Sequence, residues 1–97
     1  MLRRWAVQYG PEFAESRAAC SVPVERLEGH LKAIRLSLER DPLRYSTPFV
    51  NEARRVIETT DYTEPGFVLT AFVVLYDPFI AEVKWIEARP LPEEDLD

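Results

Sequence analysis

The chain has few of the residues that build the simplest kinds of functional site. Its 97 residues include one cysteine, one histidine and three glycines. A single cysteine excludes an internal disulfide and fits a reducing compartment, and one cysteine with one histidine cannot form a closed metal site. Three glycines are too few for a glycine-rich phosphate loop. We therefore expect a protein without a metal or another cofactor.

The sequence also lacks a long apolar run. The longest, from Phe67 to Leu75, is far shorter than the roughly 20 residues that a membrane helix needs. The opening Leu2 to Trp5 leads to Gln8 and Glu12, which is unlike a secretory signal. The length fits one domain spanning residues 1–97. We expect a soluble, cytoplasmic protein that does not associate with membranes.

The chain has fewer basic than acidic side chains. The chain carries 12 Lys and Arg against 17 Asp and Glu, for a net charge of −5. Residues 1–55 hold ten basic and seven acidic side chains, whereas residues 56–97 hold two and ten, four of these acids in the tail at about 90–97. Nonspecific nucleic-acid binders usually show a basic excess, because neutralising phosphates supplies much of their affinity. The composition argues against such binding and leaves room for a local basic patch.

The first half of the chain is expected to hold one strand and two helices. Apolar and polar residues alternate within Leu2 to Tyr9, which predicts a strand. Gly10-Pro11 ends that strand and opens a helix from about Glu12 to Cys20. The clearest helix follows, because its apolar positions recur every three or four residues, at Val24, Leu27, Leu31, Ile34 and Leu38. Asp41-Pro42 ends it.

The second half reads as three strands. They are expected at Arg54 to Thr60, Phe67 to Tyr76 and Glu82 to Ala88, with a turn at Tyr62 to Gly66 and an irregular segment before the first. The middle strand is apolar on both faces except at Thr70, which predicts either cover on both sides or a second face that meets a partner. The whole order predicts an α+β domain, with two helices packed on one face of a small, mainly antiparallel sheet.

Short phrases in the sequence sharpen this expectation. The second helix ends in a Leu-x-x-x-Pro phrase at Leu38 to Pro42, and a polar, proline-bearing link follows at Tyr45 to Phe49. The next strand begins with Arg54-Arg55, and the last strand ends with Arg89. In element order, length and these phrases, nearly the whole chain resembles the RelE/ParE superfamily, the toxins of type II toxin–antitoxin pairs.

The resemblance implies a partner and an activity. It implies a toxin that an antitoxin protein holds inactive, that acts as a ribosome-dependent mRNA endonuclease or as an inhibitor of DNA gyrase, and that is compatible with a homodimer. RNA cleavage of this type needs fixed cations around the phosphate and a group that moves a proton. The residues implied for this catalytic work are Arg89, Arg54, Arg55, Lys84 and Tyr45.

Two departures from the family pattern leave a second function open. RNA-cleaving members place an arginine at the start of the central strand, but Leu69 to Phe72 contains none. They often carry a tyrosine or histidine shortly after the final arginine, whereas Pro90 to Glu93 offers neither. The alternative is a non-catalytic protein-interaction module that keeps the fold and has lost the nuclease site. Whether the chain is an enzyme therefore stays open at this point.

Individual residues carry further expectations. Arg54 and Arg55 point to opposite faces of a strand, so at most one of them faces a given site. Lys84 is expected to pair across strands with an acid such as Glu58, and His30 to be a partly buried structural residue. Large aromatics often supply binding energy at interfaces, so we expect one or two to face a partner, among Trp5, Phe49, Phe79 and Trp85.

Overall fold

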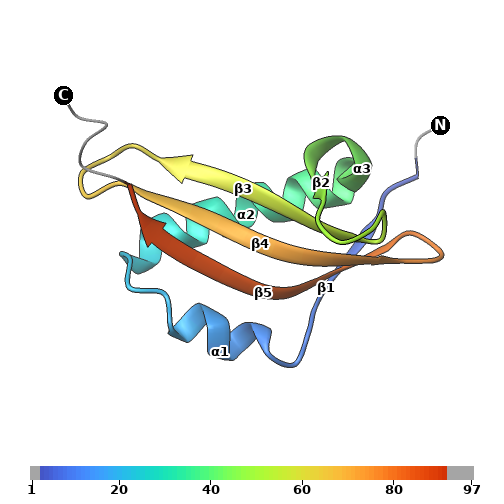
Figure 1. Cartoon of the computed structure of the whole chain (residues 1–97), viewed down its shortest axis with the longest axis horizontal. Coiled ribbons are helices and arrows are strands. Elements are labelled where there is room, and N and C mark those ends of the chain that lie inside the picture. Colours follow the sequence, from blue (N-terminus) through green and yellow to red (C-terminus); the bar gives the residue numbers. More distant parts are fainter. Residues whose placement is uncertain (1–2, 92–97) are drawn as a thin grey trace.

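The computed structural model describes residues 3–91 of the chain (Figure 1). Its elements are β1 (Ala6–Tyr9), α1 (Phe13–Ala18), α2 (Val24–Arg40), α3 (Pro42–Tyr45), β2 (Thr47–Pro48), β3 (Arg54–Asp61), β4 (Phe67–Tyr76) and β5 (Ile80–Pro90). The predicted α+β class is confirmed. The short elements α3 and β2 were not predicted, and Pro90, expected in the tail, ends β5. The four acids of that tail lie outside the described residues.

The strands form one five-stranded sheet in the order β1-β5-β4-β3-β2. β1 runs parallel to β5, and the other neighbours are antiparallel, as expected for a mainly antiparallel sheet. The register between β4 and β5 shifts at one point: Phe72 lies opposite Trp85, but Val73 lies opposite Val83. Lys84 is therefore the extra residue of a β-bulge, a feature that bends a strand and redirects its side chains.

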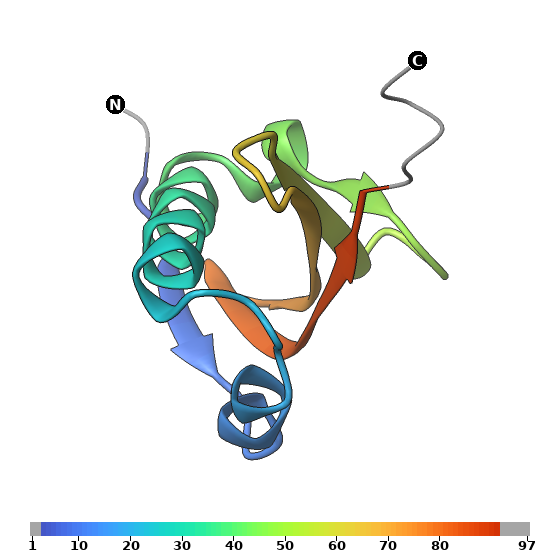
Figure 2. The same ribbon diagram turned by 90° about the vertical axis from the view of Figure 1, so that its left-hand side faces the viewer.

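The hydrophobic core lies on one face of the sheet only. Successive side chains of a strand point to opposite faces, and α2 packs over the face that carries Leu69, Ala71 and Val73 of β4, each no more than 2% exposed. Seen from one end, the sheet is strongly twisted and α2 lies against one side of it (Figure 2). No described helix covers the other face of β4, so the second predicted alternative, a face that meets a partner, stays a prediction.

α1 lies along β5 where β1 has already ended. β1 pairs only with Ile80 to Val83 of β5, and farther along β5 the backbone N–H of Ile86 donates to the Ser16 hydroxyl oxygen at 3.1 Å. Burial raises the pKa of the Cys20 thiol, and the nearby backbone of Ala88 lowers it in part. Ser16 on α1 therefore satisfies one backbone N–H of β5 at a position where no described strand pairs with this edge.

A cluster around Asp61 joins α2 to the turn between β3 and β4. The Arg26 guanidinium donates to the Asp61 carboxylate at 2.9 Å and to the carbonyls of Thr63 and Pro65. His30 Nε2 lies 3.3 Å from the same carboxylate, so the expected structural, partly buried role of His30 is confirmed. The hydrogen bonds from Arg26 and from the Thr63 backbone hold the pKa of Asp61 well below its ordinary value.

Candidate functional site

A groove of about 460 Å³ opens on the helix-free face of the sheet. We call it the Phe49–Phe72 groove, because these two rings pack edge to face within it, with their centroids 5.6 Å apart. β3, β4, the bulge of β5 and the segment after β2 supply its lining, which consists of Phe49, Val50, Arg54, Arg55, Phe72, Val73, Val74, Tyr76 and Lys84. Phe49 is 63% exposed, which is high for an aromatic side chain beside a sheet.

Arg54 brings a free cation to this groove. Its backbone N–H donates to the Asn51 carboxamide oxygen at 2.9 Å, and its carbonyl accepts from the Phe49 N–H at 2.7 Å. These bonds hold the loop that carries Phe49 against the start of β3. The Arg54 side chain is exposed, and its guanidinium makes no hydrogen bond or ion pair with any residue in the described range 3–91. It is therefore available to a ligand.

Lys84 is the second cation of the groove. Its ammonium group lies 3.4 Å from a carboxylate oxygen of Glu82, two residues earlier on the same strand. The predicted pair with Glu58 is wrong, because Glu58 lies opposite Thr70, farther along β4 than the bulge that carries Lys84. The Glu58 carboxylate instead accepts from the Thr70 hydroxyl at 3.0 Å and from Arg89 at 3.2 Å.

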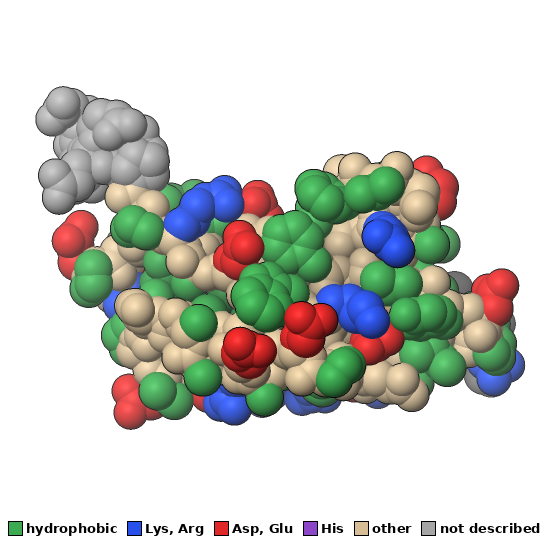
Figure 3. Space-filling model, turned by 60° about the horizontal axis from the view of Figure 1, so that its bottom comes forward, with side chains coloured by type: hydrophobic (Ala, Val, Ile, Leu, Met, Phe, Trp, Pro, Cys, Tyr) green, Lys and Arg blue, Asp and Glu red, His purple; other side chains and the backbone are tan. Residues whose placement is uncertain are grey.

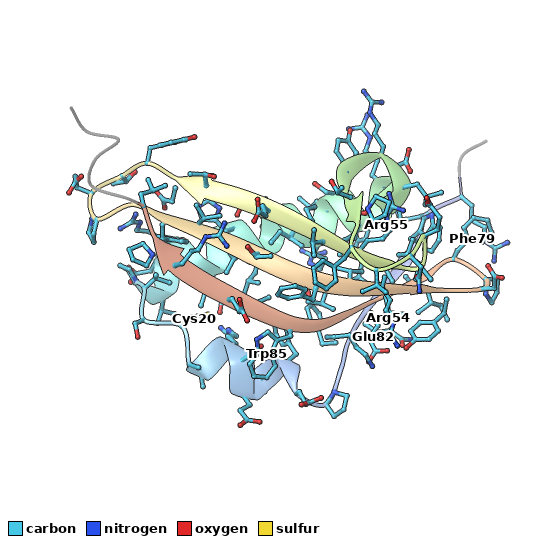
Figure 4. All side chains as sticks on the ribbon, viewed as in Figure 1. Cys20, Arg54, Arg55, Phe79, Glu82 and Trp85 are labelled. Atoms are coloured by element: carbon cyan, nitrogen blue, oxygen red, sulfur yellow. The ribbon has the colours of Figure 1, made fainter. Side chains whose placement is uncertain are left out.

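Arg55 points to the opposite face of β3, as the sequence predicted. Its side chain is buried, and its five N–H groups all donate to protein acceptors: the Ser46 hydroxyl, the carbonyls of Leu43 and Ser46, and the carbonyl and carboxylate of Glu52. Figure 4 shows Arg55 toward α3 and Arg54 toward β5. A guanidinium with no free donor cannot bind a phosphate, so this geometry favours a structural role for Arg55.

Arg89 and Tyr45 lie away from the groove. Arg89 is opposite Val68, whereas Arg54 is opposite Val74, and six strand residues span roughly 20 Å. Arg89 also forms an ion pair with Glu58 on the open face. Tyr45 lies on α3, where the Arg44 guanidinium sits over its ring at 5.5 Å, and it is not among the residues that line the groove.

The five predicted site residues thus do not form one cluster. Only Arg54 and Lys84 bring side-chain charge to one groove, and the geometry leaves the catalytic roles of all five as predictions. Tyr76, Phe72 and Val74 were missed as groove residues, although their spacing of two along β4 places them on one face. The exposed aromatics from the expected partner-facing set are Phe49 and Phe79, while Trp5 and Trp85 are partly buried.

The surface around the groove carries both signs of charge. Figure 3 shows basic and acidic side chains scattered among hydrophobic ones, with no broad patch of one sign on the side in view. Two cations, two aromatic rings and a phenol can bind an anionic group beside a flat apolar one. Among the described residues that line the groove there is no histidine, aspartate or glutamate to act as a general base.

No protein-family model, curated protein or solved structure matches this chain.

Proposed function

We propose that this chain is the toxin of a type II toxin–antitoxin pair of the RelE/ParE kind, and that it binds its cellular target at the Phe49–Phe72 groove. The element order of the fold supports the family. The observation that carries the groove is the free guanidinium of Arg54, which shares the groove with Lys84 and two aromatic rings. Most charged side chains on a protein surface are surrounded by water alone. Two cations and two aromatic rings together on an uncovered sheet face therefore favour a binding site.

The groove has the chemistry for an anionic target surface. An arginine fork binds phosphate or carboxylate through two parallel hydrogen bonds, and such charge-assisted bonds are among the strongest that proteins make. The exposed Phe49 ring offers a face for an apolar or planar group beside that anion. Both features fit a toxin that inhibits by binding.

Inhibition by binding is better supported than RNA cleavage. Cleavage through the 2′-hydroxyl needs a group that removes its proton and cations that stabilise the charged phosphorus centre. The groove offers cations, but its described lining has neither an imidazole nor a carboxylate. Arg89 is roughly 20 Å of strand away. We therefore place the chain with inhibitors such as those that poison gyrase.

The antitoxin has a separate surface available in this proposal. Two adjoining hollows of about 490 and 430 Å³ lie beside α1 and α2 and share Tyr9, Phe13 and Arg17 in their linings. The first hollow is lined mainly by apolar side chains such as Leu27, whereas the second adds Leu31 and the charged side chains of Glu28, Lys32 and Arg35. Apolar side chains beside charged ones suit an amphipathic helix, which is the form expected of the antitoxin segment here.

Induced expression in a bacterial host tests this proposal. We expect the wild-type chain to stop growth, with mRNA intact and DNA supercoiling changed. Arg54→Ala should relieve the arrest, because losing a charge-assisted contact weakens target binding by about 30-fold. Arg40→Ala is the matched control, since Arg40 is an exposed arginine at the end of α2 and is not among the residues that line the groove.

Other outcomes would change the assignment. Growth arrest with cleaved mRNA would support the endonuclease in place of the binding inhibitor. Harmless expression at a level where the chain is folded would contradict the toxin and support the non-catalytic interaction module. Equal toxicity of wild type and Arg54→Ala would remove the groove from the mechanism.

A further inference from the structure

The helix-free face of the sheet has an apolar centre. In Figure 1 α2 lies behind the sheet, so this face is turned toward the viewer. Its middle is Phe72 on β4, with Val56 opposite on β3, Trp85 opposite on β5 and the exposed ring of Phe49 packed against it. Apolar side chains gathered in this way on an uncovered face usually mark a site of interaction.

Two charged residues of this face lack a partner among residues 3–91. Arg54 is the free cation of the groove, and Glu87 on β5 is its counterpart of opposite sign. The Glu87 side chain is exposed, and its carboxylate makes no hydrogen bond or ion pair with a described residue. The remaining charges of the face already form pairs, which are Lys84 with Glu82 and Arg89 with Glu58.

The two unpaired charges lie on opposite sides of Phe72 and at the same distance from it. Arg54 is opposite Val74, two residues along β4 in one direction, and Glu87 is opposite Thr70, two residues in the other. Each charged residue is thus one strand across and two residues along from Phe72, which is roughly 8 Å. Their Cα atoms are about 16 Å apart on this spacing, too far for the two side chains to meet within one chain.

We propose that two copies of the chain associate through this face, with Arg54 of each copy paired to Glu87 of the other. A twofold axis that lies between the two sheets, passes over Phe72 and runs at right angles to the line from Arg54 to Glu87 exchanges these two positions. A self-complementary interface of this kind is the commonest in homodimers. Sheets stacked face to face lie about 10 Å apart, a gap that an arginine and a glutamate bridge together.

The charge pattern selects a second copy as the occupant. A partner surface of one sign would satisfy one of the two unpaired charges and be repelled by the other. A second copy supplies both signs at the required spacing, and the apolar centre around Phe72 then meets its own equivalent. Because Lys84 and Arg89 are already paired, they add no uncompensated charge to the contact.

The size of the face predicts a weak dimer. β3 and β4 are paired over eight residue pairs, so the faces of β3, β4 and β5 together measure roughly 27 by 14 Å. Two such faces with their side chains bury on the order of 1,000 Å² in total, which is the range of weak, reversible complexes.

Association through this face regulates the groove, because Arg54 belongs to both surfaces. A second copy covers the groove, so only the monomer can bind the target, and dilution releases the binding-competent form. This regulation rests on the proposed function. The association itself does not, since it also depends on Glu87, which is not among the residues that line the groove.

Sedimentation velocity of the purified full chain tests the association. We expect a concentration-dependent dimer with a Kd on the order of 50 μM. Arg54→Glu and Glu87→Arg each place like charges opposite one another in a homodimer, so each variant should bind itself at least about tenfold more weakly. An equimolar mixture of the two variants should restore the wild-type Kd, because both contacts then join opposite charges.

Two further variants complete the experiment. Glu25→Arg reverses an exposed acid on α2, the helix that covers the opposite face, and as the matched control it should leave the dimer unchanged. Glu87→Gln keeps the size of the side chain and serves as a second test should a charge reversal prevent folding. It removes the two weak ion pairs of the dimer, so we expect an affinity loss of about fivefold.

Three results would overturn the dimer. The first is a wild-type chain that stays monomeric at about ten times the expected Kd. The second is a dimer that Arg54→Glu, Glu87→Arg and Glu87→Gln all leave intact, since it would then use another surface. The third is loss of the dimer in both reversals without rescue in their mixture, with both variants folded by circular dichroism. Harmless expression in a bacterial host, by contrast, would contradict the toxin and leave the dimer standing.

Discussion

Arg54 and Arg55 are neighbours in the chain and opposites in the structure. Arg55 faces α3, is only 4% exposed, and spends all five donors on Ser46, Leu43 and Glu52. Arg54 faces the helix-free side, is exposed, and leaves its guanidinium without a described partner. The same residue type therefore has a structural role on one face of β3, as Arg55, and is available to bind a ligand on the other, as Arg54.

This difference extends to the two faces of the sheet. On the helix-covered face, charges such as Arg26 and Asp61 are held in short, multiple hydrogen bonds. On the open face, Lys84 and Arg89 make single, longer and more exposed ion pairs. Charge on the covered face should thus matter for stability, and charge on the open face for binding.

The largest expected effect comes from exchanging the two arginines for alanine one at a time. Arg55→Ala leaves buried acceptors around Ser46 and Leu43 without donors, so we expect it to lower the free energy of unfolding by about 3 kcal/mol. Arg54→Ala removes an exposed side chain, and its expected cost is within about 0.5 kcal/mol. Urea unfolding followed by circular dichroism measures both.

A conservative variant sharpens this first comparison. Arg55→Lys keeps the charge but has three donors on one atom and cannot reproduce the planar fork, so we expect it to lose about 2 kcal/mol. Equal stabilities for Arg54→Ala and Arg55→Ala would show that the network around Arg55 does not stabilise the fold.

A smaller, pH-dependent effect is expected on the covered face. The ordinary pKa of an aspartate such as Asp61 is near 3.8, and the pKa of Asp61 in the folded protein is lower. The contribution of the ionised carboxylate to stability is therefore complete above about pH 3.8. The contribution is lost as the pH falls toward the folded pKa. Asp61→Asn should therefore be less stable than wild type at pH 6, and the difference should shrink below pH 4. Urea midpoints across this range give the measurement, and a constant difference would contradict the assignment.

The smallest effect belongs to the ion pair on the open face. Arg89 and Glu58 are both about half exposed, and exposed pairs contribute about 0.5 kcal/mol or less. Arg89→Ala and Glu58→Gln should each leave the urea midpoint nearly unchanged, with any difference disappearing in 1 M salt. A loss comparable to that of Arg55→Ala would mean that the two faces do not differ in the way described.

The sequence predicted the elements that its periodicity defines. α2 follows from apolar spacing, β5 from alternation and β4 from a continuous apolar run, because these patterns report which side chains the core buries. α3 and β2 could not be predicted in this way. They are short, and they are held by the Arg55 network, which joins residues nine and twelve positions apart and leaves no periodic trace.

The sequence predicted only part of the candidate site. The opposite directions of Arg54 and Arg55 follow from strand geometry, and that expectation is confirmed. The separation of Arg89 from Arg54 depends on how β3 and β5 align across β4. The position of Lys84 depends on a bulge, which shifts one residue relative to its neighbours and has no clear signature in composition.

The bond between Ser16 and Ile86 also bears on how the chain folds. Seventy residues separate its partners, and among the described strands β1 likewise pairs with β5 alone. Contacts between such distant positions slow folding, since a large loop must close before they form. During synthesis, β1 and α1 leave the ribosome first. They can pair with β5 only after nearly the whole chain has been made. The last strand made therefore completes the packing of the first elements made.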